Sequence, residues 1–146
     1  MRTLARTLSL AAILAGVLLL PGSAVAATGQ VTTAATCHAG AAACPIRLTF
    51  ATGAYSAQRS STLTGHTSTR WFSVRARAGQ TLIVVIEGAG ATQGTVYAPN
   101  RQHSGQPGGR VFDAPLTVSG TYRIRVSESA TAEGWHGSVT VLVVAY

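Results

Sequence analysis

Residues 70–87 carry the clearest alternation of apolar and polar side chains in the chain. Every second residue is apolar in Arg70–Arg77, and the apolar positions of Thr81–Glu87 recur with the same period of two. Such alternation is typical of β-strands that bury one face. The short connection Ala78–Gln80 contains a glycine, so the two segments are predicted to form a β-hairpin. The other face of the first strand is aromatic and cationic, which is a composition of binding surfaces.

Short runs of the same character recur after residue 45, separated by glycine, serine, asparagine and proline. No segment keeps a helical period over three turns, so the pattern predicts an all-β fold, an antiparallel β-sandwich of about seven or eight strands. The last run is apolar on both faces, which is typical of a central or covered strand. The polar, glycine-containing stretch 99–109 is predicted to be a mobile loop. The predicted strands are Ile46–Ala51, Ser60–Thr64, Arg70–Arg77, Thr81–Glu87, Gly94–Ala98, Arg110–Asp113, Thr121–Ser127 and Ser138–Ala145.

The first residues have the pattern of a secretory signal peptide. Arg2 and Arg6 precede the apolar run Leu8–Leu20, and Ala24–Ala26 fits a small-x-small cleavage site. A membrane anchor is the alternative, but the run is shorter than the ~20 residues that a bilayer span needs. We therefore expect a secreted protein, extracellular or in the cell envelope, with no stable membrane insertion after cleavage. The predicted organisation is a signal peptide (1–26), a flexible Ala/Thr-rich arm (27–45) and one sandwich domain (46–146).

The predicted arm holds the only two cysteines, Cys37 and Cys44. In an oxidising compartment they are predicted to form a disulfide, with two free thiols as the alternative. A metal site would need more ligands than these cysteines and His38 supply. Neither a metal nor a cofactor is expected.

The chain is basic, with eleven arginines, no lysine and four acidic residues, for a formal net charge of +7. This charge favours acidic partners such as anionic cell-wall polymers. It does not indicate nucleic-acid binding, because the chain has no basic cluster or recognition motif and is predicted to be exported.

Motifs of catalysis are missing from the sequence. It has no nucleophile elbow, no zinc-protease motif, no phosphate-binding loop and no acidic cluster for calcium. Glu128 and Glu133 share one predicted loop, which does not imply a cleft between two carboxylates. We therefore assign no catalytic residue and predict a non-enzymatic binding protein.

Candidate binding residues on predicted strands are aromatic and cationic. Trp71 and Arg75 share the polar face of one strand, and Arg123 and Arg125 share a face of another. A sugar or peptide could stack on Trp71 while Arg75 pairs with a carboxylate or phosphate. The alternatives are a packed Trp71 under a neighbouring strand or loop, and solvated arginines paired with Glu87 or Glu128.

Candidate binding residues also occur in two predicted loops. His66 lies in the loop 65–69, and Glu133, Trp135 and His136 lie in the loop 127–137. An exposed tryptophan beside a titratable histidine is common in recognition surfaces. Packing of Trp135 over the end of the sandwich is the alternative.

The order of several short motifs resembles a known family. The strand 70–77 and the turn Ala78–Gln80 stand between two such motifs, Phe50-x-x-Gly53-x-x-Ser56-Ala57-Gln58-x-Ser60-x-x-Leu63-x-Gly65 and Ser119-Gly120-x-Tyr122-x-Ile124-x-Val126. This order resembles the bacterial periplasmic inhibitors of g-type lysozyme. It also resembles the broader pre-peptidase C-terminal β-sandwich modules of secreted enzymes.

The resemblance covers about residues 47–145 and implies an antiparallel β-sandwich. It also implies stoichiometric binding of a secreted protein, such as a lysozyme, through loops at one end of the sandwich. The corresponding loops here are 65–69 and 127–137. A cell-wall or polysaccharide-binding module that uses the face of Trp71 and the arginines is the alternative. A monomer or a weak dimer is expected.

Overall fold

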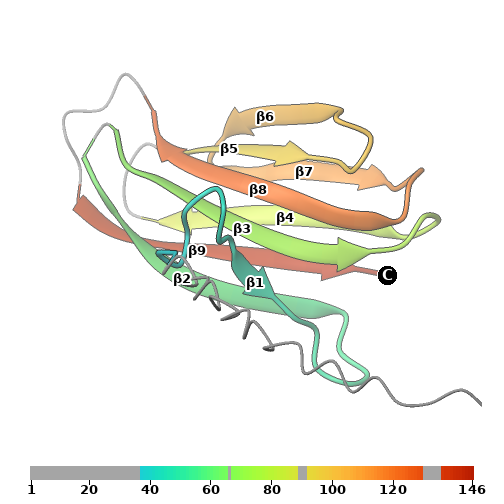
Figure 1. Ribbon diagram of the computed structural model, residues 1–146. Coiled ribbons are helices and arrows are strands. Elements are labelled where there is room, and N and C mark those ends of the chain that lie inside the picture. The colour runs from blue at the N-terminus through green and yellow to red at the C-terminus, as the bar shows by residue number, and fades with distance from the viewer. Residues whose placement is uncertain (1–36, 66, 89–91, 130–135) are drawn as a thin grey trace, which may run out of the picture. The chain divides into compact units, whose positions relative to one another are not determined.

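The computed structural model describes residues 37–65, 67–88, 92–129 and 136–146 (Figure 1). These residues fall within one compact unit, Ala35–Tyr146. The part of the chain described in this way contains no helix that is long and apolar enough to cross a bilayer. Its strands are β1 (Ile46–Leu48), β2 (Ser56–Thr64), β3 (Thr69–Ala76), β4 (Thr81–Gly88), β5 (Thr92–Tyr97), β6 (His103–Pro107), β7 (Gly109–Pro115), β8 (Gly120–Glu128) and β9 (His136–Ala145).

The strands form two sheets that pack face to face (Figure 1). The five-stranded sheet has the order β1-β3-β8-β5-β6, and the four-stranded sheet has the order β2-β9-β4-β7. The paired strands run antiparallel except for β1, which lies parallel to β3. This arrangement confirms the predicted β-sandwich, with nine described strands in place of seven or eight.

The core lies between the two sheets and is built from alternate residues of the inner strands. Because successive side chains of a strand point to opposite faces, one set from each strand meets the other sheet. Each large aliphatic or aromatic side chain buried in this way contributes about 1.5–3 kcal/mol. The largest fully buried side chains are Phe72, Leu63, Leu82, Ile124, Val74, Val84, Val96, Val111, Val126, Val139, Val141 and Val143.

Tyr122 brings a polar group into this apolar layer. Its side chain is only 2% exposed, and its hydroxyl donates a hydrogen bond of 2.7 Å to the carbonyl oxygen of Val118. This is the geometry of a tyrosine corner, which ties the start of a strand to the loop before it. Burial raises the pKa of Tyr122 above its usual value of 10.0, because the charged phenolate is disfavoured in an apolar environment.

The predicted hairpin of Arg70–Arg77 and Thr81–Glu87 is wrong. Strand β3 pairs with β1 and β8, whereas β4 pairs with β7 and β9 in the other sheet. The turn at Gly79, where φ is +87°, therefore carries the chain from one sheet to the other. Alternation shows which face of a strand is buried. It does not distinguish two strands side by side from two strands that face each other across a core.

The stretch 99–109 is also not a simple loop, because it contains strand β6. This strand pairs along its length with β5 at the edge of the sheet. Most of its residues are exposed, and it contains Gly105 and Pro107. An edge strand without a buried face shows no apolar alternation, so the pattern missed it.

The last strand is central, as its two apolar faces predicted. Strand β9 lies between β2 and β4, and its inward residues are fully buried. On the outer face Val144 pairs with Ile83 of β4, and Leu142 pairs with Val85. These four side chains are half-buried and account for the second apolar face.

Candidate functional site

The pairing of β3 with β8 gathers the arginines of both strands on one surface. The register places Trp71 opposite Arg125, and Ser73 opposite Arg123. Arg75 therefore lies diagonally beside Arg123, within the range of cross-strand contacts between long side chains. The outer face of the five-stranded sheet carries these residues, and we call it the cationic face.

Strand β1 adds another arginine to the cationic face. Its parallel pairing with β3 sets Arg47 opposite Ser73. Arg47 and Arg75 line one shallow depression of about 290 Å³, together with Ser73 and Thr121. Both arginines are exposed. The depression thus presents two guanidinium groups to solvent at one place.

Aromatic rings form a row across the same face. The ring centroids of Trp71 and Tyr97 are 5.4 Å apart, and those of Tyr97 and His103 are 5.6 Å apart. The Arg123 guanidinium carbon lies 4.6 Å from the centroid of the Trp71 ring, which is a cation–π contact. Trp71 is therefore half-buried within a cross-strand cluster and stays at the surface.

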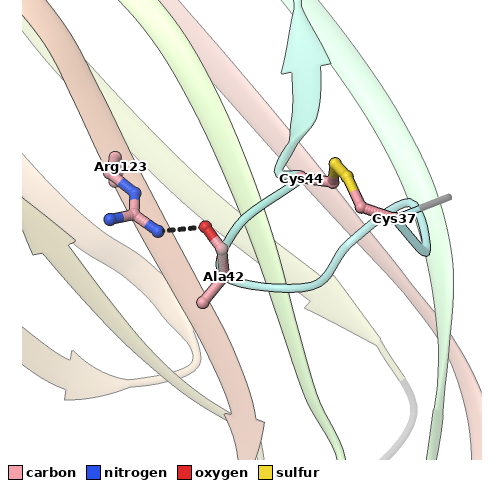
Figure 2. The surroundings of a disulfide bond; sticks show 4 residues. All are labelled: Cys37, Ala42, Cys44 and Arg123. Atoms are coloured by element: carbon pink, nitrogen blue, oxygen red, sulfur yellow. Dashed lines mark hydrogen bonds between the residues drawn. A yellow bond between two sulfur atoms is a disulfide. The ribbon is translucent and has the colours of Figure 1, made fainter. Parts of the chain in front are cut away.

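The disulfide loop is attached to this cluster (Figure 2). Cys37 and Cys44 form the predicted disulfide, with their Cα atoms 5.9 Å apart. The backbone N–H of Trp71 donates to the carbonyl oxygen of Gly40 at 2.8 Å, and the Arg123 guanidinium donates to the carbonyl oxygen of Ala42. Figure 2 shows Arg123 pointing from its strand toward the loop. The side chain of Arg123 is thus engaged in holding the loop.

Acidic side chains lie elsewhere in the described residues. Glu87 is in β4 and Asp113 in β7, both in the other sheet, and Asp113 forms an ion pair of 2.7 Å with Arg110. Glu128 is 5% exposed and belongs to the inward side of β8. The predicted alternative of a pair between Glu87 and Arg123 or Arg125 therefore does not occur.

The two candidate loops begin and end at one end of the sandwich. Thr64 pairs with His136 where β2 and β9 meet, and Thr69 pairs with Ser127 where β3 and β8 meet. The strand ends that flank the two loops therefore lie at the same end of the sandwich. His136 is exposed at the start of β9. The other candidates of these loops, His66, Glu133 and Trp135, lie outside the described residues.

Sequence reasoning missed Arg47, Tyr97 and His103 as members of the cationic face. Arg47 joins it through a parallel pairing between segments about 25 residues apart, which the alternation does not reveal. Tyr97 was placed on a predicted strand, but its partner His103 lies in the missed strand β6. Three or more histidine, cysteine, aspartate or glutamate side chains do not come together as a metal site anywhere in the described residues.

Comparison with known proteins identifies similar folds among solved structures. The periplasmic inhibitor of g-type lysozyme (PliG) from Aeromonas hydrophila matches with a TM-score of 0.60 and 28% identity, over 70% of this chain and 96% of that one. PliG from Salmonella Typhimurium matches with a TM-score of 0.58 and 18% identity, over 70% of this chain and 97% of the other. A mutant of the Escherichia coli inhibitor matches with a TM-score of 0.56 and 19% identity, over 70% of this chain and 97% of the other.

No protein-family model and no curated protein matches the sequence. The structural matches confirm the resemblance to the lysozyme inhibitors at the level of the fold. The similarity extends over nearly the whole length of each inhibitor, so it is not limited to one sheet or one motif.

Proposed function

We propose that this chain is a secreted, non-enzymatic protein that inhibits a g-type lysozyme by stoichiometric binding. The observation that carries the proposal is the similarity to three inhibitors of that lysozyme class over 96–97% of their length. The predicted signal peptide and disulfide agree with a protein that works outside the cytoplasm.

The binding surface in this proposal is the end of the sandwich that carries the loops 65–69 and 127–137. Strand pairing brings the bases of both loops to the same end. Loops that extend from a rigid β-scaffold are suited to enter a cleft, because the sheets hold their ends in place. The sequence puts His66 in one loop, and Glu133, Trp135 and His136 in or beside the other. These four residues are the proposed contacts.

The direct test is titration of the protein, expressed without residues 1–26, into lysis assays with g-type and c-type lysozymes. We expect saturable inhibition of the g-type enzyme at about one molecule of protein per molecule of enzyme. The c-type enzyme should keep its activity. Unchanged g-type activity at a large excess of folded protein would overturn the proposal.

A pair of matched variants tests the location. Trp135→Ala removes an aromatic side chain from the proposed surface, and buried aromatic anchors dominate many interfaces. We expect it to weaken inhibition by at least about tenfold. Tyr55→Ala removes an exposed aromatic side chain next to the start of β2, at the opposite end of the sandwich, and should leave inhibition unchanged. Equal effects of the two variants would place the contact elsewhere.

A further inference from the structure

We propose that the cationic face is a second binding site, and that it binds a linear anionic glycan. The ligand class is a sugar polymer with carboxylate or phosphate groups along its chain. The depression at its centre lies away from the loops proposed to contact lysozyme, and its ligand is of a different chemical class. The proposal does not depend on the inhibitory function.

Charge is the first argument for a ligand. The cationic face holds Arg47, Arg75, Arg123 and Arg125, and the described acidic residues lie in the other sheet or on the inner side of β8. The strand registers set each of these arginines opposite an uncharged residue, so their charges lie side by side on the face without facing one another directly. Among the described residues, this face carries no carboxylate beside them. A bound polyanion would supply negative charge to the face.

The depression at Arg47 and Arg75 is the proposed position of the anionic group of the ligand. Its side chains offer two guanidinium forks and two hydroxyls, from Ser73 and Thr121. A guanidinium group binds a carboxylate or phosphate through paired hydrogen bonds, which are stronger than neutral ones. Arg123 is held by the disulfide loop, whereas Arg47 and Arg75 form no ion pair or side-chain hydrogen bond within the described residues. They are therefore available to an external anion.

The aromatic row favours a sugar polymer over a bare polyanion. The rings of Trp71, Tyr97 and His103 follow one another across the strands, with the Arg123 guanidinium over Trp71, Tyr97 stacked on His103, and His103 exposed at the end of the row. The apolar side of a sugar ring packs against such aromatic surfaces while its hydroxyls stay in water. The disulfide loop is attached at the Trp71 end of the row, whereas His103 is exposed at the other end. A sugar chain can therefore pack against His103 while its charged groups reach the arginines of the same face.

The test uses three polymers that separate charge from sugar chemistry. Alginate supplies sugar rings with carboxylates, dextran supplies neutral sugar rings, and inorganic polyphosphate supplies charge without sugar. We expect calorimetric titration to show binding of alginate that weakens as salt rises, because exposed charge pairs are screened. Dextran should bind much more weakly. If polyphosphate binds as tightly as alginate, the ligand is not specifically a glycan and the proposal is overturned. If alginate does not bind at low salt, the cationic face is not a binding site for an anionic glycan.

Charge-matched variants test the position of the site. The double variant Arg47→Gln and Arg75→Gln should weaken alginate binding by about tenfold, since it removes two exposed charge pairs. The control is Arg59→Gln with Arg101→Gln, which removes the same charge from exposed positions of β2 and of the turn before β6. Equal weakening in both would show attraction by net charge alone and overturn the proposal.

The aromatic contribution has its own variant. His103 is exposed at the end of the row, so His103→Ala removes a ring without opening the core. We expect it to weaken alginate binding about threefold and to leave the weaker polyphosphate binding unchanged. A loss of the same size for both polymers would argue against stacking and overturn the assignment to a glycan. The thermal unfolding curves of His103→Ala and of both double arginine variants should match that of the wild type, which shows that each variant is folded.

Discussion

Tyr122 is the buried polar residue whose role the structure defines most sharply. Its hydroxyl donates to the carbonyl oxygen of Val118, and its ring is part of the core. We expect Tyr122→Phe to keep the packing but to lower the free energy of unfolding by about 1 kcal/mol, the usual net contribution of one hydrogen bond. Urea unfolding of both proteins at neutral pH measures this difference. An unchanged stability would mean that the carbonyl of Val118 finds another donor.

The same residue gives stability a dependence on alkaline pH. Burial raises the pKa of Tyr122 in the folded state above 10.0, so the folded protein holds the phenol proton more tightly than the unfolded chain. Its contribution is therefore fully present below pH 10.0 and is lost as pH rises through the higher folded pKa. The wild type should lose more stability than Tyr122→Phe between about pH 8 and pH 11, measured by urea unfolding. Parallel pH profiles would contradict this prediction.

Single residues on the cationic face were only partly predictable. Alternation placed Trp71 and Arg75 on the outward side of one strand, and Arg123 and Arg125 on the outward side of another. Their contacts depend on which strands are neighbours, and the neighbouring strands β3 and β8 are about 50 residues apart along the chain. The cation–π contact of Arg123 with Trp71 and the ring contact with Tyr97 therefore appear only in the folded structure.

At the scale of elements, the alternation of apolar and polar residues predicted where strands occur better than it predicted which strands pair. The apolar alternation of β3, β4 and β8 follows from burial of one face, and it predicted each of them. Burial against the opposite sheet gives the same alternation as pairing in a hairpin, so the partner of β3 could not be inferred. Strand β6 buries little apolar surface and left no signal.

The disulfide loop is the element whose removal has the most specific consequence. Replacement of both Cys37 and Cys44 by serine should lower the free energy of unfolding by about 2.5 kcal/mol, from the chain entropy of a short loop. It should also break the hydrogen bonds by which the backbone N–H of Trp71 and the guanidinium of Arg123 hold carbonyl oxygens of the loop. A shift in Trp71 fluorescence, measured in a Trp135→Phe background, reports that release.

Reduction of the wild-type disulfide provides the control for this variant. Both changes open the same bond, so the reduced protein and the serine variant should show the same fluorescence shift and the same stability. A variant as stable as the oxidised protein would contradict a structural role for the disulfide. An unaltered Trp71 signal would show that the hydrogen bonds to Gly40 and Ala42 hold the loop without the disulfide.

At the scale of the whole molecule, charge and loops divide the surface into two regions. The cationic face covers the five-stranded sheet, and the proposed lysozyme-binding loops extend from one end of the sandwich. Arg75 lies six residues along β3 from Thr69, which corresponds to about 20 Å at ~3.3 Å per residue. Exposed charges at that distance are largely screened at physiological salt, where the Debye length is about 8 Å. The depression at Arg47 and Arg75 and the loops should therefore bind their ligands independently.

Independent binding can be measured with short alginate oligomers, which fill the cationic face without covering the loops. We expect the protein to inhibit g-type lysozyme equally well with and without saturating oligomer. Lysozyme alone with oligomer corrects for any effect on the enzyme, and the Arg47→Gln, Arg75→Gln variant shows whether an effect requires the face. Inhibition that falls in step with oligomer occupancy in the wild type, but not in this variant, would contradict independence. It would mean that the lysozyme contact extends from the loops onto the sheet, and that one surface serves both ligands.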